Sequence, residues 1–209
     1  MKNNKITILG YGKSGIAAAK LAKHIGFDVF ISDSRKLIPE LLETEFKYEL
    51  GGHSQKIYDS NIIVVSPGIS KKTEIKKNAI KKGIRFISEI EFASTFTESK
   101  IIGITGSNGK TTVSKLIYRI LKDYGLNVML GGNIGIPFSE NVYNEMTKNR
   151  NNNYHVVEIS SFQLEDIENF NPDISCLLNI TSDHLDRYNN EFMEYTKTKF
   201  KIIKNYDKD

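Results

Sequence analysis

Short apolar runs alternate with longer amphipathic segments along the chain. In the first hundred residues the apolar runs predict buried strands at 5–9, 28–32, 62–66 and 84–88. The segments between them predict helices at 16–25, 39–50 and 71–82. After residue 100 the alternation resumes, with strands expected at 101–105, 127–130, 154–159 and 174–180 and helices at 111–124, 137–148, 161–169 and 191–205. This order predicts an α/β protein whose parallel sheets are covered by helices on both faces.

A polar segment at 95–100 separates the two halves of this pattern. We therefore expect two domains, one over residues 1–98 and one over residues 99–209. Each half contains a glycine-rich turn between a predicted strand and a predicted helix. The first domain is accordingly expected to be Rossmann-like, and the second to be a P-loop-type α/β domain.

The first glycine-rich turn is Gly10-Tyr-Gly-Lys-Ser-Gly15, which has the spacing of dinucleotide-binding turns. Asp33 ends the second predicted strand, where an acid would bond a ribose hydroxyl. Such turns also serve as tight strand–helix connections, so a purely structural turn is the alternative. An NAD site would need a hydride-transfer centre, whereas the second half offers a triphosphate loop and metal-binding residues. We therefore favour a nucleotide-linked substrate in the first domain and ATP in the second.

The second turn, Gly103-Ile-Thr-Gly-Ser-Asn-Gly-Lys110-Thr111-Thr112, is the most informative segment of the chain. Backbone N–H groups at a turn of this kind converge on one point, where the helix dipole also favours an anion. Lys110 can reach the outer phosphates, and the Thr111 hydroxyl is placed to bind Mg²⁺. The usual P-loop has a glycine in place of Ile104, and a turn that only caps a helix is the alternative. The expected ATP-binding residues are Gly106, Ser107, Asn108, Gly109, Lys110, Thr111 and Thr112.

Two further polar positions end predicted strands of the second half. Glu158 follows a buried run and could hold Mg²⁺ directly or through water, with a salt-bridged or helix-capping glutamate as the alternative. His184 lies among acids and an arginine and could bind metal or substrate. The other histidines, His24, His53 and His155, are expected to be ordinary surface residues.

The composition is that of an ordinary globular protein, with 39% hydrophobic and 26% charged residues among 209. The 29 basic and 25 acidic residues are scattered, and the lysine pairs between residues 71 and 82 fit the solvated face of one helix. We therefore expect no nucleic-acid binding. No apolar run is long enough to span a membrane, and the N-terminus does not resemble a signal peptide. A single cysteine allows no disulfide within the chain, and we expect a cytoplasmic protein with no membrane partner.

Taken together, these segments resemble one family, the bacterial Mur ligases. The segment 105–111, Thr-Gly-Ser-Asn-Gly-Lys-Thr, is similar to the ATP loop of that family, which accounts for the displaced first glycine. Three later segments resemble further motifs of the ligase that adds D-glutamate, namely Gly131-Gly-Asn-Ile-Gly135, Glu158-Ile-Ser-Ser-Phe-Gln-Leu-Glu165 and Asn179-Ile-Thr-Ser-Asp-His-Leu-Asp-Arg-Tyr188. Ser66-Pro-Gly-Ile69 and Ser88-Glu-Ile-Glu91 extend the resemblance into the first half.

The resemblance implies an ATP-dependent amide ligase of peptidoglycan precursor synthesis. Its substrates would be ATP, D-glutamate and UDP-N-acetylmuramoyl-L-alanine, whose carboxylate would be activated as an acyl phosphate. The cofactors implied are two Mg²⁺ ions and a carbamate formed from CO₂ on Lys199. A monomer is expected.

Site residues are also implied by the resemblance. The catalytic set would be Lys110, Glu158, His184 and Lys199, and the metal ligands would be Thr111, Glu158, His184 and carbamylated Lys199. The substrate contacts would be Lys13, Ser14, Asp33, Ser34, Arg35, Gly68, Asn133, Ser160 and His184. The neighbouring Lys197 and Lys201 make the choice of Lys199 depend on the alignment of its segment.

The family has a third domain after the central one, and residues 99–209 match only part of the central domain. We therefore expect the C-terminal domain to be absent from this sequence, and the chain to bind the UDP-sugar but to catalyse ligation poorly. The alternatives are a sibling ligase for another peptidoglycan residue or for folate polyglutamylation, an NAD-dependent dehydrogenase, and a non-catalytic nucleotide-binding module.

Overall fold

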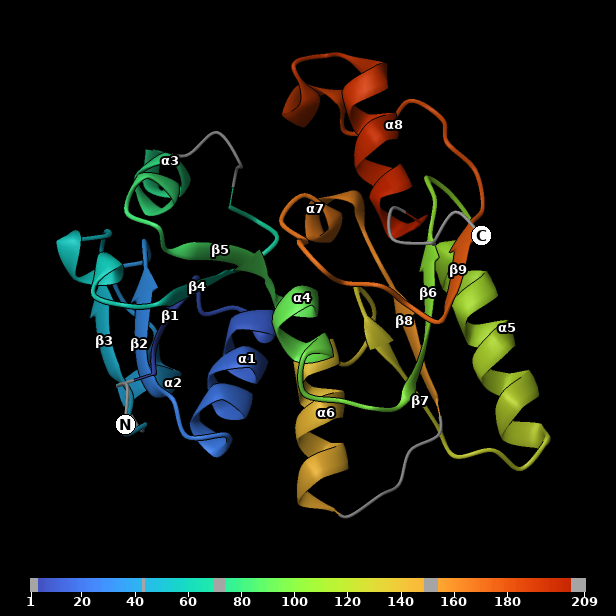
Figure 1. The fold of residues 1–209 in the computed structure, drawn as a ribbon, viewed down its shortest axis with the longest axis horizontal. Coiled ribbons are helices and arrows are strands. Elements are labelled where there is room, and N and C mark those ends of the chain that lie inside the picture. Colours follow the sequence, from blue (N-terminus) through green and yellow to red (C-terminus); the bar gives the residue numbers. More distant parts are fainter. Residues whose placement is uncertain (1–3, 43, 70–73, 149–153, 204–209) are drawn as a thin grey trace.

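The computed structural model describes residues 4–42, 44–69, 74–148 and 154–203, and it contains two parallel β-sheets (Figure 1). The first sheet has the order β3-β2-β1-β4-β5, and the second has the order β7-β8-β6-β9. The strands are β1 (Lys5–Leu9), β2 (Asp28–Asp33), β3 (Lys47–Leu50), β4 (Ile62–Val65), β5 (Arg85–Ser88), β6 (Lys100–Thr105), β7 (Val128–Gly132), β8 (Tyr154–Glu158) and β9 (Ile174–Leu177). All pairings are parallel, which confirms the predicted fold class.

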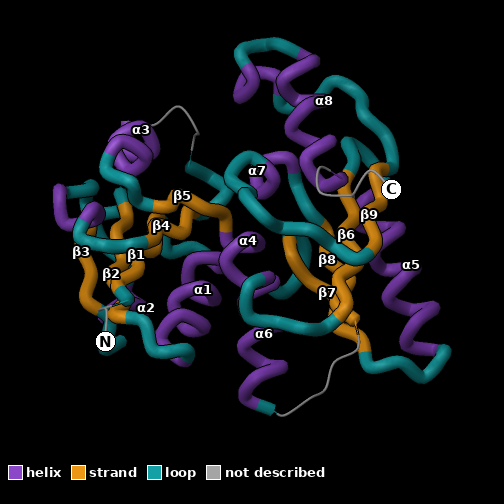
Figure 2. The backbone as a smooth tube through the Cα atoms, viewed as in Figure 1, coloured by secondary structure: helices purple, strands orange, loops and turns teal. Residues whose placement is uncertain are grey.

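Helices cover both sheets and also fill the space between them (Figure 2). They are α1 (Lys13–His24), α2 (Pro39–Leu42), α3 (Glu74–Lys81), α4 (Glu89–Ser94), α5 (Lys110–Asp123), α6 (Phe138–Thr147), α7 (Ser161–Leu164) and α8 (Phe192–Phe200), with 3₁₀ turns at 55–58, 185–188 and 201–203. Helices α1, α4 and α6 contact one another between the two sheets, whereas α5 packs on β6, β7 and β8 from the far side. Among the described residues, no helix is both long enough and apolar enough to cross a membrane.

Two predicted helices differ from the structure. The single helix expected over 39–50 is wrong, because α2 ends at Leu42 and the strand β3 pairs with β2. The alternation of Phe46, Tyr48 and Leu50 is typical of a strand and was the stronger signal. The helix expected over 161–169 stops at Leu164. Residues 71–73 and 204–205 of two other predicted helices, and most of the expected loop at 148–153, lie outside the described residues.

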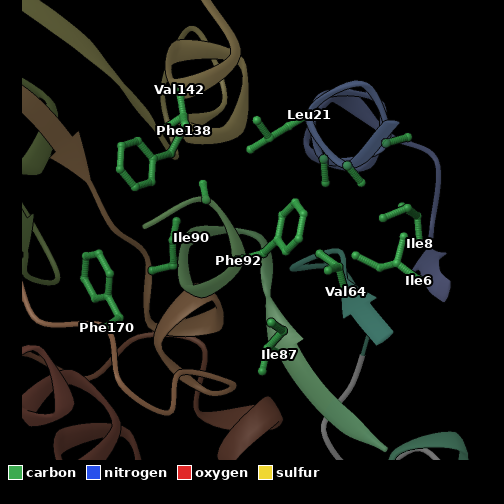
Figure 3. Packing of buried hydrophobic residues seen from close by; sticks show 14 of the residues in the cluster. Ile6, Ile8, Leu21, Val64, Ile87, Ile90, Phe92, Phe138, Val142 and Phe170 are labelled. Carbon is green, nitrogen blue, oxygen red and sulfur yellow. The ribbon is translucent and has the colours of Figure 1, made fainter. Parts of the chain in front are cut away.

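Helix α4 is not among the predicted elements, and it joins the two halves of the molecule. The boundary expected near residue 98 falls in the segment between α4 and β6. One hydrophobic core runs from Ile8 of the first sheet through Leu21 and Phe92 to Phe138 and Val157 of the second half (Figure 3). The two halves therefore share buried surface, and their relative placement is fixed by side-chain packing.

The carboxylate of Glu91 in α4 binds the backbone that follows α7. It is fully buried and accepts hydrogen bonds from the backbone N–H groups of Glu168, Asn169 and Phe170, at 2.9, 3.0 and 2.7 Å. Nearby, the backbone N–H of Ser88 donates to the carbonyl of Asp166. Because these backbone groups bond across to the first half, they are not available to extend α7.

A second buried carboxylate of α4, Glu89, lies against the start of α6. It accepts a hydrogen bond from the backbone N–H of Ser139, the second residue of α6. Burial raises the pKa of Glu89 from 4.5 to about 7, although the bond to Ser139 opposes this shift. Lys76 of α3 adds an ion pair to the buried Asp166 across the same interface. The expectation that this lysine lies on a solvated helix face is therefore wrong.

We predict that Glu91→Ala lowers the free energy of unfolding by about 3 kcal/mol, because it removes a buried acceptor from three backbone donors. Urea unfolding followed by circular dichroism measures this change. Glu98→Ala is the matched control, because Glu98 is exposed and its loss should change stability by less than about 0.5 kcal/mol. Equal effects of the two substitutions would contradict the assigned role of Glu91.

We also predict a pH dependence that depends on Glu89. Its pKa is raised on folding, so the native state keeps a proton that the unfolded state releases, and stability falls between about pH 4.5 and pH 7. Glu89→Gln cannot release this proton. Between about pH 4.5 and pH 7, the free energy of unfolding of Glu89→Gln should therefore rise by about 3 kcal/mol relative to that of the wild type. Urea titrations at several pH values test this, with the exposed Glu98→Gln as control; parallel stability curves for wild type and Glu89→Gln would refute it.

Candidate functional site

A cavity of about 550 Å³ lies at the carboxyl ends of β1, β2 and β4 in the first sheet. Because β1 pairs with β2 on one side and β4 on the other, this is the switch point of the sheet, where ligands of such folds bind. Its lining includes Gly10, Gly12, Lys13, Ser14, Asp33, Ser34, Arg35, His53, Ser66, Pro67, Gly68 and Ile69. Every first-half residue expected to contact substrate therefore lies around one cavity.

Asp33 holds the walls of this cavity together. One of its carboxylate oxygens accepts the backbone N–H of Tyr11 at 2.7 Å, and the other accepts the backbone N–H of Arg35 at 2.8 Å. The Arg35 guanidinium bonds both oxygens and also the carbonyl of Tyr11. The hydrogen bond from Arg35 is the largest cause of a pKa of Asp33 held well below its usual range. These contacts occupy the carboxylate, so its expected bond to a ribose or substrate hydroxyl stays a prediction.

His53 was missed as a site residue. It is half-buried and lines the cavity, and its Nδ1 lies 2.6 Å from the hydroxyl of Ser32 at the end of β2. That hydroxyl donates in turn to Glu49 of β3. The expectation of an ordinary surface histidine rested on the general rule that a lone histidine is usually a surface residue. The strand β3 instead brings His53 to the sheet edge that carries the cavity.

The second glycine-rich turn follows β6 and begins α5. Gly109 caps α5 with a φ of 83°, a backbone conformation that favours glycine. The Lys110 ammonium donates to the carbonyl of Gly106 at 2.8 Å and to that of Ser107 at 2.9 Å, so it lies across the mouth of the turn. The turn thus has the free helix N-terminus and the lysine that phosphate binding requires.

The turn is braced by the segment that follows β9. The Ser107 hydroxyl lies 2.8 Å from the Tyr195 hydroxyl and bonds both the N–H and the carbonyl of Thr181. The backbone N–H of Asn108 donates to the side chain of Asn179, whose amide donates back to the Asn108 carbonyl. The side chain of Ser107 and the backbone of Asn108, both in the expected ATP-binding set, therefore hold the turn in shape.

Three segments meet at the carboxylate of Glu158. It is 1% exposed, and it accepts the hydroxyl of Thr111 at 2.8 Å and the side-chain amide of Asn133 at 2.9 Å. The backbone N–H of Asn133 also donates to the Glu158 carbonyl. A carboxylate and a threonine hydroxyl are oxygen donors of the kind that Mg²⁺ prefers, so these residues fit the expected metal. Thr112 is exposed at the same helix start.

Lys199 of α8 points into the glycine-rich turn. Its side chain is 1% exposed, and its ammonium donates to the carbonyl of Gly106 at 2.9 Å, the same oxygen that Lys110 contacts. Burial, reinforced by the charge of Lys110 and opposed by Asp183, lowers the pKa of Lys199 from 10.5 to about 8. The Lys199 ammonium also lies over the Tyr195 ring, 4.8 Å from its centre.

His184 and Ser160 complete the predicted set. The His184 side chain is half-exposed, with its Nε2 3.6 Å from Asp183, and its backbone φ is 49°. No cluster of three metal-binding His, Cys, Asp or Glu side chains occurs in the part of the chain that the structure describes. The Ser160 hydroxyl caps α7 by bonding Gln163, so its contact with substrate stays a prediction.

His155 differs most from the expectation. It is fully buried in β8, with its Nε2 2.8 Å from Glu145 of α6. Glu145 also accepts the hydroxyls of Thr97 and Ser99, which lie in the segment between the sheets. His155 is therefore a structural residue, whereas His24 is exposed as expected.

Two family models match the chain. The model of the Mur ligase middle domain matches residues 104–209, which is half of the chain and includes the Thr111–Glu158 pair. The chain belongs to the Mur ligase family. The model of the MurD N-terminal domain matches residues 5–75, where most of the lining of the first cavity lies.

Curated relatives agree with this membership. The UDP-N-acetylmuramoylalanine–D-glutamate ligase of Christiangramia forsetii is 47% identical in an alignment 206 residues long, which covers 96% of this chain and 45% of that protein. The enzyme of the same name from Cytophaga hutchinsonii is 46% identical, covering 97% of this chain and 46% of that protein. The chain thus spans about half the length of these relatives.

Solved structures support the fold. The UDP-N-acetylmuramate:L-alanyl-gamma-D-glutamyl-meso-diaminopimelate ligase from Neisseria meningitides has a TM-score of 0.61 at 17% identity, covering 99% of this chain and 69% of that one. A murein peptide ligase from Psychrobacter arcticus has a TM-score of 0.52 at 20% identity, covering 93% of this chain and 46% of that one. At these identities the likeness concerns the arrangement of the two sheets alone.

Proposed function

We propose that this chain is the UDP-sugar-binding and ATP-binding portion of a ligase that adds D-glutamate to UDP-N-acetylmuramoyl-L-alanine. The observation that carries the proposal is the meeting of Thr111, Asn133 and Glu158 beside the Lys110 turn. The names of the curated relatives supply the substrates. The proposal includes a division into domains at residue 98, a monomeric state and a cytoplasmic location, which remain predictions.

The first cavity is proposed to hold the uridine diphosphate group. Lys13 and Arg35 bring positive charge to its lining. The glycines of the lining, Gly10, Gly12 and Gly68, let the backbone approach the ligand closely. Ser14, Ser34 and Gly68 line the same cavity and offer hydroxyl and backbone groups for hydrogen bonds. Asp33 would act by fixing Arg35, whose guanidinium suits a diphosphate.

The second turn is proposed to hold ATP at the start of α5. Lys110 would turn from the carbonyls of Gly106 and Ser107 to the outer phosphates, and the backbone N–H groups at the start of α5 would donate to them. Thr111 and Glu158 would hold one Mg²⁺, which supplies positive charge that offsets the repulsion between phosphate groups. Asn133 would keep Glu158 in place and reach toward the substrate.

In the proposed reaction, an oxygen of the substrate carboxylate attacks the γ-phosphorus of ATP, which gives an acyl phosphate and releases ADP. The neutral amine of D-glutamate then attacks the acyl carbon, phosphate leaves, and the nitrogen loses a proton as the amide forms. The residues of this chain would bring two anions together and neutralise them, which requires positioning and fixed charge. Lys110 would stabilise the transferring phosphoryl group, and His184 and Ser160 would contact the substrate from the neighbouring segments.

Lys199 is proposed to react with CO₂ to form a carbamate. A neutral amine is needed for this addition, which releases one proton and leaves an anionic oxygen ligand. With a pKa of about 8, close to one Lys199 side chain in ten is neutral at pH 7, about 300 times the fraction of an ordinary lysine. Carbamylation would change Lys199 from a cation to an anion beside Lys110. Together with His184, the carbamate would hold a second Mg²⁺.

Two other functions remain as alternatives. A sibling Mur ligase would share the turn at Lys110, but the 47% identity to a D-glutamate ligase favours the substrate proposed above. A non-catalytic nucleotide-binding module would keep both sites without turnover. Trapping of the acyl phosphate distinguishes this module from an active ligase.

We predict that the chain binds UDP-N-acetylmuramoyl-L-alanine saturably in isothermal titration calorimetry and does not bind NADH. Arg35→Ala should weaken the UDP-sugar by about 10-fold or more, because a guanidinium that can pair with phosphate is lost. Lys23→Ala is the control, since this lysine is exposed outside the cavity lining. Binding of NADH in place of the UDP-sugar would overturn the proposal.

We also predict a carbamate signal from Lys199 in ¹³C NMR spectra recorded with ¹³C-bicarbonate. The signal should strengthen as the pH rises from about 7 toward 8, because more of the amine becomes neutral as its pKa is approached. Lys199→Ala should abolish it. Lys197→Ala should keep it, because the Lys197 side chain is exposed and pairs with Glu194 at the surface. A signal that survives in Lys199→Ala would assign the carbamate to another lysine.

A further inference from the structure

Arg187 joins the two candidate sites across a long sequence distance. Its side chain is only 12% exposed, and its Nη2 donates to the carbonyl of Ile69 at 2.7 Å. Ile69 lines the first cavity, whereas Arg187 follows His184 in the second half. This hydrogen bond directly links the loop at the first cavity to the segment that carries His184.

The orientation of the Arg187 side chain is fixed from two sides. Its Nε and Nη2 donate to the two carboxylate oxygens of Glu165, each at 2.9 Å, and this carboxylate is fully buried. The guanidinium carbon also lies 4.2 Å from the centre of the Phe162 ring. A paired and stacked guanidinium is held in one plane, and a lysine could not reproduce either contact fully.

The contacts continue from Arg187 to His184. The Phe162 ring that stacks on Arg187 also contacts the His184 ring, with the ring centres 5.1 Å apart. In addition, the backbone N–H of Arg187 donates to the His184 carbonyl at 3.1 Å. A displacement of the Arg187 side chain would therefore change the surroundings of the His184 ring through Phe162.

The other end of these contacts is tied to the first cavity. The backbone N–H of Ile69 donates to the carbonyl of Ser66, and the Ser66 hydroxyl donates to the carbonyl of Gly10 in the first glycine-rich turn. A ligand that displaced this loop would move the Ile69 carbonyl and, with it, the hydrogen bond to Arg187. His184 itself is not part of the cavity lining.

We propose that Arg187 is a positioning residue. It couples occupancy of the first cavity by a uridine diphosphate group to the position of the His184 ring. The proposal rests on the proposed function, since it needs that ligand in that cavity. It adds a residue that touches neither ligand and acts through Phe162 and the Ile69 carbonyl. Direct evidence for this coupling is a response of His184 to a ligand in the first cavity.

Histidine ring NMR signals provide that evidence at fixed pH with uridine diphosphate as the probe. The full chain contains four histidines, and two of them report on different steps. His53 lines the cavity and reports binding, whereas His184 reports transmission. The two signals are assigned with His53→Asn and His184→Asn.

In the wild type, uridine diphosphate should shift the signals of both His53 and His184. In Arg187→Lys, the His53 shift should persist and the His184 shift should fall by about fivefold or more, because the contact that transmits the change is lost. Phe162→Leu should give the same result, and it keeps the proposal testable if Arg187→Lys does not fold. Unchanged His24 and His155 signals show that a variant is folded.

Arg85→Ala is the matched control. Arg85 also bridges the two halves, through its ion pair with Glu168, whereas the ring contacts described for Phe162 are with Arg187 and His184. It should leave the His184 shift intact. A His184 shift that persists in Arg187→Lys and Phe162→Leu, or a wild-type His184 that stays silent while His53 responds, would overturn the coupling alone. A silent wild-type His53 would overturn the proposed function and the coupling with it.

Discussion

The candidate ATP site depends on the register in which β8 pairs with its two neighbours. Ile104 of β6 and Gly132 of β7 both lie opposite Glu158, so the loops that follow these strands reach the same carboxylate. The hydroxyl of Thr111 and the amide of Asn133 meet there for that reason. A slip of one residue along β8 would turn the Glu158 side chain to the other face of the sheet, and both contacts would be lost.

Charge is distributed unevenly around this point. On one side a buried carboxylate satisfies two donors, and on the other side Lys110 and Lys199 share the carbonyl oxygen of Gly106. Two ammonium groups at one oxygen, one of them buried, repel each other, and Asp183 partly offsets this effect on Lys199. An arrangement of this kind stabilises anions that enter it. The positive charge around the turn therefore favours an anion such as a phosphate group.

The fold could be predicted largely from local patterns, because each buried strand is short, apolar and bounded by turns. The glycine-rich turns and the strand-end residues Glu158 and His184 could be found in the same way. Features that depend on long-range contacts could not. The shortness of α7 follows from bonds between its following backbone and Glu91, and the role of His53 follows from strand pairing of β3. The near-complete burial of Lys199 could not be predicted either, because its segment has the pattern of a basic amphipathic helix.

The first glycine-rich turn shows why its spacing is a weak guide to the ligand. A Cβ atom added at Gly15 would lie 2.0 Å from the carbonyl oxygen of Gly10, so the glycine is required for the chain to pass from β1 into α1. Beside such turns, an acid at the end of the second strand is expected to bond a ribose. Here that acid is Asp33, and its carboxylate is already bonded by Arg35 and by the Tyr11 N–H. Proteins that recognise quite different nucleotides can therefore keep identical glycines. Assignment of a cofactor in uncharacterised sequences with this turn should weigh the side chains around the cavity above the glycine spacing.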